Sequence, residues 1–143
     1  MFDDKTFVDT NIIIYAYDMT AGKKHQTARR ILKELWESGL GVLSTQILQE
    51  FFVNVVKKIP KPIDADRAEY IIKDFLTWEV VVNDGLAVLD AITICKKYGY
   101  SFWDSLIIDA AIKSGSKIIL TEDLCEGQVL EGLIIQNPFH LSE

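Results

Sequence analysis

Short apolar runs alternate with longer amphipathic segments along the chain. The short runs predict buried strands at residues 5–8, 42–43, 80–82, 117–120 and 133–135. The longer segments predict helices at residues 11–17, 23–38, 45–59, 64–76, 85–98 and 104–114. Strands that alternate with helices are typical of α/β proteins. The pattern therefore predicts a three-layer α/β/α sandwich with a mainly parallel central sheet.

Local signals indicate where the helices end and which faces they bury. Gly39 ends the helix 23–38, and Gly99 stands where a left-handed residue ends a helix. Ser44 or Thr45 can cap the helix 45–59. Prolines in the run 59–62 stop that helix. The expected apolar faces are Ile47, Leu48, Phe51, Phe52, Val55, Val56 and Ile59 on the third helix, and Val88, Leu89, Ile92 and Cys95 on the fifth.

Length and composition indicate one globular domain over residues 1–143, since no repeat or linker divides the chain. Hydrophobic residues make up 49% and charged residues 25%. No apolar run approaches the ~20 residues that cross a bilayer, and residues 1–5 lack the features of a signal peptide. Cys95 and Cys125 lack metal-ligand spacing. We therefore expect no membrane association, and free thiols in a reducing cytoplasm.

The charge balance limits the partners that the protein can bind. A net charge of −6 counts against tight non-specific binding of nucleic acid, and suits a cation site or a basic protein partner. Local basic groups are nevertheless present at Lys23, Lys24, Arg29 and Arg30, and at Lys57, Lys58 and Lys61. Such groups are more often solvated faces than binding sites.

Two carboxylates follow predicted parallel strands. Asp9 comes directly after the strand 5–8, and Asp123 follows the strand 117–120. The carboxyl ends of parallel strands meet at one edge of a sheet, so both side chains are expected there. Clustered carboxylates repel one another, and a hard divalent cation relieves the repulsion. Helix capping is the alternative role for Asp9, and also for Asp104 at the start of a helix.

Glu50 lies on the predicted helix 45–59, away from the apolar stripe. It shares a side with Gln46, Asn54 and Lys57. Periodicity permits this side to face a cleft or solvent, and solvent is the commoner environment for a lone glutamate. The spacing alone leaves both environments open.

Four segments together resemble the PIN domain, and most closely the VapC-type toxins of prokaryotic toxin–antitoxin pairs. They are Val8–Asn11, Leu43–Phe51, Phe102–Ile107 and Leu120–Leu124, within a likeness that spans about residues 5 to 139. The resemblance implies a metal-dependent ribonuclease that uses Mg²⁺ or Mn²⁺. The residues that match the catalytic and metal-binding acidic quartet are Asp9, Glu50, Asp104 and Asp123. Thr121 and Asn11 match positions that orient ligands, with Asn11 steadying the first aspartate.

The resemblance also implies partners. Similar proteins are homodimers that cleave RNA and are neutralised by a small antitoxin. The C-terminal segment of that antitoxin lies along the active-site groove and offers a basic or aromatic side chain. An RNA base stacking on Trp103 is conceivable, but packing in the core is the preferred interpretation.

Two further acids lie beside the matching positions. Asp109 departs from the usual pattern of these toxins and lies roughly 140° around the helix from Asp104. We expect it to orient a ligand or to lie at the surface. Glu122 adjoins Asp123 and is not expected among the ligands.

Other enzyme classes fit the residues less well. A haloacid-dehalogenase phosphatase needs a second aspartate where Asn11 stands, and a receiver domain needs acids that match Asn83 and Asp84 only loosely. Neither His25 nor His140 lies near Ser101 or the other motifs, which disfavours a serine hydrolase. The remaining alternative is a catalytically weak PIN-like module that binds RNA or protein.

Overall fold

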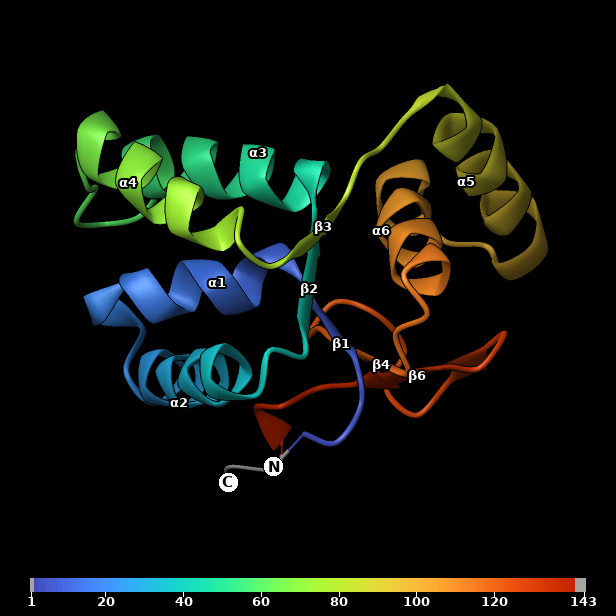
Figure 1. The fold of residues 1–143 in the computed structure, drawn as a ribbon, viewed down its shortest axis with the longest axis horizontal. Coiled ribbons are helices and arrows are strands. Elements are labelled where there is room, and N and C mark those ends of the chain that lie inside the picture. The colour runs from blue at the N-terminus through green and yellow to red at the C-terminus, as the bar shows by residue number, and fades with distance from the viewer. Residues whose placement is uncertain (1, 141–143) are drawn as a thin grey trace.

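One six-stranded sheet crosses the centre of the computed structural model, which describes residues 2–140 (Figure 1). The strands are β1 (Thr6–Val8), β2 (Gly41–Ser44), β3 (Glu79–Val81), β4 (Ile118–Leu120), β5 (Val129–Leu130) and β6 (Leu133–Gln136). Their order in the sheet is β3-β2-β1-β4-β6-β5. All neighbours are parallel except β5, which runs antiparallel to β6. The mainly parallel sheet is therefore confirmed.

Helices cover both faces of this sheet. Those on one face are α1 (Thr10–Tyr17), α2 (Lys23–Ser38), α3 (Thr45–Val53) and α4 (Ala65–Phe75), and those on the other are α5 (Gly85–Tyr98) and α6 (Phe102–Lys113) (Figure 1). A short 3₁₀ turn, η1 (Met19–Ala21), joins α1 to α2. This arrangement confirms the three-layer α/β/α sandwich. Within residues 2–140, no helix is both long and apolar enough to cross a membrane.

Capping residues place several helix ends where the sequence predicts them. Ser44 Oγ accepts a hydrogen bond from the Ile47 amide at the start of α3. Gly39 adopts a left-handed conformation with φ of 72° after α2, and its amide donates to Leu35 O. A residue without a Cβ takes this conformation without strain, so α2 ends at the predicted residue.

The third predicted helix does not continue as an α-helix to residue 59. After α3 the chain forms a π-helical turn, η2 (Asn54–Lys58), in which the Ile59 amide donates to Asn54 O at 3.1 Å. Each hydrogen bond of a π turn spans one residue more than in an α-helix, so every later side chain rotates to a new position. Phe52, just before this turn, is exposed, whereas the sequence pattern predicts it on the buried face.

The buried face of α5 also differs from the prediction. Small residues, including Ala87 and Ala91, pack against Leu106 of α6. The larger apolar side chains Val88, Leu89 and Ile92 are exposed, with 61% of Leu89 accessible. Small side chains let two helices approach closely, so the face with less apolar area is the buried one.

A glycine in β2 makes room for a tryptophan. A Cβ added to Gly41 would lie 2.3 Å from Cζ3 of Trp78. The Trp78 ring packs against Trp36 and Phe75 at centroid distances of 5.0 and 5.2 Å. Position 41 therefore has no space for any side chain.

Candidate functional site

The strand register places Asp9 beside Thr121. Val8 of β1 pairs with Leu120 of β4, so the residues that follow these strands lie next to each other. The Thr121 hydroxyl donates to Asp9 Oδ2 at 2.7 Å, and the Thr10 amide donates to Asp9 Oδ1 at 2.7 Å. Asp9 also caps α1, so the capping contact and the contact with the end of β4 are made by the same carboxylate.

The Asp9 carboxylate is costly to ionise where it lies. Its side chain is only 6% exposed, and burial raises its pKa from 3.8 to about 6. The hydrogen bonds from Thr121 and Thr10 oppose this rise, and the nearby charges of Asp123 and Glu50 add to it. A cation beside the carboxylate would remove this penalty.

Asp123 is held from two directions. Asn11 Nδ2 donates to Asp123 Oδ2 at 2.9 Å, and the Asp123 amide donates to Thr121 Oγ1 at 3.1 Å. Burial and the charges of Glu122 and Asp104 raise the pKa of Asp123. The sequence prediction that Asn11 steadies Asp9 is therefore wrong, because its amide group reaches the other strand end.

Glu50 faces this site and not open solvent. Its Oε1 accepts a hydrogen bond of 2.6 Å from the Thr10 hydroxyl, and its Oε2 accepts one of 3.4 Å from Gln46 Nε2. Gln46 lies one helical turn before Glu50, so α3 itself supplies the second donor. Thr10 was not predicted to take part, although its place directly after Asp9 is a signal for it.

Asp104 does not cap its helix. Ser101 is the cap of α6, since its Oγ accepts a hydrogen bond from the Asp104 amide at 3.1 Å. The Asp104 carboxylate accepts no hydrogen bond from any residue between 2 and 140. It lies in the first helical turn, where the helix dipole favours negative charge.

All four carboxylates line one cavity of about 470 Å³. Its other walls are Thr10, Asn11, Gln49, Val53, Asn54, Lys58, Trp103 and Ile107. Four carboxylates make a set of hard oxygen donors, which suits Mg²⁺ or Mn²⁺. Across residues 2–140, however, no three His, Cys, Asp or Glu side chains already converge closely enough to hold an ion. The carboxylates of Asp9, Glu50 and Asp123 instead accept hydrogen bonds from other groups of the protein.

Glu122 does not line the cavity, although Asn11, which does, donates to Glu122 Oε1 at 3.5 Å. Its carboxylate accepts hydrogen bonds from Tyr15 Oη at 2.5 Å and from Lys24 Nζ at 2.8 Å. The same ammonium group lies over the rings of Tyr15 and Phe139. The Glu122 carboxylate raises the pKa of Lys24. This cluster ties the loop that carries Asp123 to α1 and α2.

Asp109 also lies outside the cavity. The sequence pattern allowed a position at the surface, but the side chain is buried. It lies on α6 and forms an ion pair of 2.9 Å with Lys113, which also contacts Asp90 of α5. Burial raises the pKa of Asp109. Asp109 therefore belongs to a cluster of charges at the contact between α6 and α5, away from the cavity.

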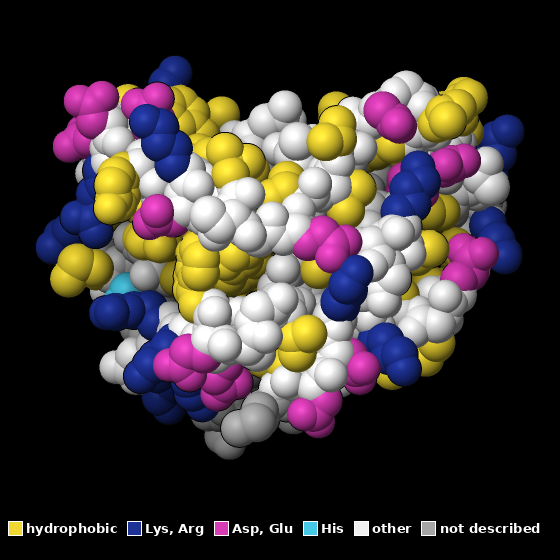
Figure 2. Space-filling view, viewed as in Figure 1, with side chains coloured by type: hydrophobic (Ala, Val, Ile, Leu, Met, Phe, Trp, Pro, Cys, Tyr) yellow, Lys and Arg dark blue, Asp and Glu magenta, His cyan; other side chains and the backbone are white. Residues whose placement is uncertain are grey.

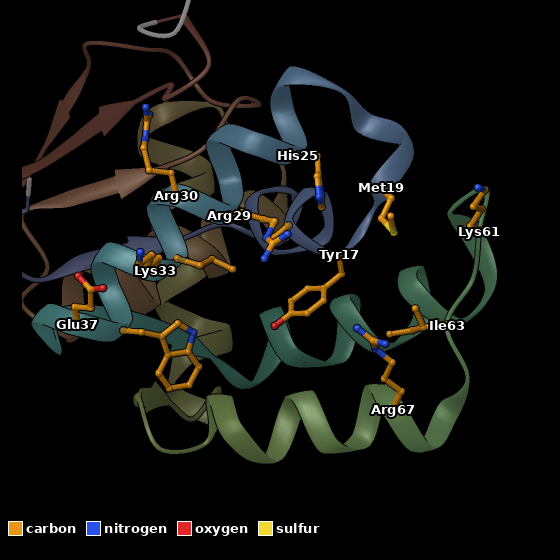
Figure 3. A pocket seen from close by; sticks show the side chains of 13 residues that line it. Tyr17, Met19, His25, Arg29, Arg30, Lys33, Glu37, Lys61, Ile63 and Arg67 are labelled. Atoms are coloured by element: carbon orange, nitrogen blue, oxygen red, sulfur yellow. The ribbon is translucent and has the colours of Figure 1, made fainter.

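A second, larger cavity of about 920 Å³ lies between α1, α2 and α4 (Figure 3). Apolar residues, including Leu32, Trp36 and Ile63, form part of its wall. The basic residues that line it are His25, Arg29, Arg30, Lys33, Lys61 and Arg67. Tyr17 points into the space between α2 and α4 (Figure 3), and burial raises its pKa. Figure 2 shows a hydrophobic hollow on the side of these helices, with Lys and Arg side chains beyond its edge.

Comparisons with known proteins agree with this architecture. No curated protein sequence matches the chain. The solved structure of VapC20 from Mycobacterium tuberculosis, described as a sarcin-ricin loop cleaving toxin, is 21% identical, with a TM-score of 0.65 over 82% of this chain and 91% of that one. A toxin–antitoxin complex from Klebsiella pneumoniae contains a chain that is 14% identical, with a TM-score of 0.68 over 93% and 97%. A DNA-bound VapBC from Salmonella typhimurium is 19% identical, with a TM-score of 0.63 over 95% and 99%.

These three likenesses describe the fold, and the sequence itself identifies the family. The PIN domain family model matches residues 6–124, which include Asp9, Glu50, Asp104 and Asp123. The chain therefore belongs to the PIN domain family.

Proposed function

We propose that the protein is a Mg²⁺- or Mn²⁺-dependent endoribonuclease and the toxin of a toxin–antitoxin pair. The observation that carries this proposal is the buried Asp9 carboxylate, which shares one cavity with Glu50, Asp104 and Asp123. Four acids from four separated segments are costly to bring together unless a cation joins them. Membership of the PIN family supports the same activity.

In this proposal the four carboxylates hold the cation, and neighbouring groups orient them. Thr121 and the Thr10 amide fix Asp9, the Thr10 hydroxyl fixes Glu50, and Asn11 fixes Asp123. A bound divalent cation supplies a water of lowered pKa and stabilises charge on the scissile phosphate. Asp104 has no protein donor within residues 2–140, so its carboxylate is the one most available to a cation.

Cleavage of a mixed cellular RNA pool tests the activity. The purified protein is incubated with Mn²⁺, beside an Asp104→Asn variant and an EDTA control. Asp66→Asn, an exposed acid on α4, is the matched variant that should cut like the wild type. Cutting at discrete positions that is lost only with Asp104→Asn and EDTA supports the proposal. Cutting that survives Asp104→Asn contradicts it.

A catalytically weak binding module is the second candidate function. The observation that favours it is the absence, within residues 2–140, of three acids that already converge on one point. Such a protein would bind RNA without cutting it. The RNA pool assay separates the two functions when RNA retention on a filter is measured alongside cleavage.

The second cavity supports a partner of apolar and acidic character. Its apolar floor and basic edge complement an amphipathic helix with acidic residues. The structural neighbours include toxin–antitoxin complexes, and we propose that an acidic antitoxin segment, distinct from the C-terminal one expected along the active-site groove, occupies this second cavity. A designed Leu/Glu amphipathic peptide serves as the probe. Its binding should be weakened by Arg29→Glu, and a Leu/Lys peptide should not bind.

A homodimer of single-domain chains is the proposed assembly. We infer that the chain forms one domain, since β5 and β6 lie beyond the family match and belong to the same sheet as the matched strands. The exposed apolar side chains Val88, Leu89 and Ile92 of α5 support contact with a second copy, because adjoining exposed apolar groups mark interaction sites. Sedimentation of wild-type and Leu89→Asp protein tests this assembly, and a monomeric wild type would contradict it.

A further inference from the structure

Trp103 presents its indole to solvent at the edge of the acidic cavity. The side chain is 63% exposed, so the expectation that it packs in the core is wrong. Its neighbour Phe102 is half-buried and packs against Ala87, Ala91 and Leu106. The two rings meet edge to face, with centroids 5.1 Å apart and planes at 80°. An exposed tryptophan supported in this way offers a free aromatic face.

The backbone near Trp103 is also fixed. Gln46 Nε2 donates to Trp103 O at 3.3 Å, and the same group contacts Glu50. Ser101 caps the first turn of α6 just before the indole. The backbone that carries the ring therefore has a defined position relative to the carboxylates, and most of the ring surface is exposed.

Lys58 is the only basic residue among the described residues that line this cavity. Lys57 comes seven residues after Glu50, which is about two turns of a regular α-helix, so the sequence pattern predicts that both lie on the same side. The π turn η2 takes one more residue, so Lys58 occupies that side instead. A single cation thereby joins a wall that carries four acids.

We propose that Trp103 and Lys58 bind an unpaired nucleotide next to the cleaved bond, with its base stacked on the indole and a phosphate paired with the ammonium group. This inference rests on the proposed ribonuclease function and assigns two residues besides the four carboxylates to substrate binding. A base can stack on a protein ring only when it has left its own stack, so duplex RNA is excluded. The cavity repels phosphate with four carboxylates, and Lys58 provides local compensation.

Tryptophan fluorescence measures the stacking contact without cleavage. The Asp104→Asn protein is titrated with short oligoadenylate, oligouridylate and a blunt RNA duplex. Oligonucleotides that lack secondary structure should quench the fluorescence, and the duplex should not. Trp103→Leu in the same background should abolish the quenching and weaken binding, measured as RNA retention on a filter, by roughly 5- to 150-fold, whereas Trp103→Phe should retain most of the affinity on the filter. Tyr70→Leu is the control, because Tyr70 is equally exposed on α4 and outside the cavity.

The phosphate contact has its own matched pair of variants. Lys58→Gln should weaken binding of both oligonucleotides and reduce the salt dependence by about one phosphate contact. Lys57→Gln removes the same charge from the adjacent residue, which does not line the cavity, and should leave both quantities unchanged. Equal effects from the two lysines would mean a general charge effect and would overturn the assignment to Lys58.

The outcomes separate this inference from the ribonuclease proposal. If the wild type cuts RNA and Trp103→Leu neither weakens binding nor raises KM, the nucleotide site is wrong and the ribonuclease stands. If the wild type never cuts but Trp103→Leu abolishes binding, the nucleotide site stands and the ribonuclease proposal fails. If Trp103→Leu dissociates a dimer on sedimentation, a second copy covers the indole and the inference is overturned.

Discussion

Replacement of Asp9 by asparagine should make the metal-free protein more stable at neutral pH. The substitution removes the charge and keeps the shape, and the side-chain carbonyl oxygen that replaces the carboxylate can still accept from the Thr10 amide. The Thr121 hydroxyl loses its carboxylate acceptor, which costs ~1 kcal/mol at every pH. Set against this loss is the removal of a buried carboxylate whose pKa is raised to about 6.

The sign and size follow from proton linkage. Below the ordinary pKa of 3.8, Asp9 is protonated in both the folded and the unfolded protein, so burial carries no ionisation cost. As pH rises, the unfolded chain releases its proton first, and the folded protein loses stability until the pH exceeds about 6. The full loss is roughly 3 kcal/mol at 1.36 kcal/mol per pH unit. The variant should therefore match the wild type near pH 4.5 and exceed it by ~2 kcal/mol at pH 8.

Urea unfolding in EDTA at several pH values measures this difference. Glu69→Gln, which removes an exposed acid on α4, serves as the control for the loss of one surface charge. If the stability difference between wild type and Asp9→Asn stays constant from pH 4.5 to 8, burial does not penalise the carboxylate. If the variant is the less stable protein at pH 8, the capping role of Asp9 outweighs its charge.

Three further results are expected. Millimolar Mn²⁺ should raise the melting temperature of the wild type through binding linkage but raise that of Asp104→Asn less, and equal shifts in thermal denaturation would contradict the role of Asp104. Gly41→Ala should lower the free energy of unfolding by ~1–3 kcal/mol in urea, because the new Cβ meets the Trp78 ring, whereas Gly85→Ala has open space and should not destabilise. Lys24→Met should leave Glu122 without its ion pair and raise the metal concentration needed for half-maximal RNA cleavage, since the loop carrying Asp123 loses an anchor; an unchanged metal dependence would contradict this.

Most of the fold could be predicted from short-range signals. The helix 23–38 has the predicted ends because a glycine cap acts within one turn of the chain. Asp9 and Asp123 lie at the same edge of the sheet because β1 and β4 are parallel neighbours. The alternation of strands with helices in the sequence already predicts parallel strands. The hairpin of β5 and β6 was not predicted. Its turn uses Glu131 at a φ of 51° before Gly132, and a glutamate is an unusual residue for that conformation.

The parts of the site that were mispredicted depend on contacts between distant segments. Periodicity places Lys57 beside Glu50, and only the π turn moves Lys58 there. Asn11 lies two residues after Asp9, yet its amide group bonds to Asp123 because the β4 loop comes within reach. Trp103 and Phe102 are both large aromatic residues, and which of them is buried depends on how α5 packs against α6. None of these choices has a local signature.

The order of strands also has a consequence for synthesis. β4 pairs with β1 in the middle of the sheet, although more than a hundred residues separate Thr6 from Ile118 in the chain. Asp123 and the Thr121 hydroxyl that fixes Asp9 both follow β4. A nascent chain that has not yet released this strand from the ribosome has an incomplete set of acids. For the proposed ribonuclease, each molecule would therefore become active only after β4 and the loop that carries Asp123 have emerged and folded.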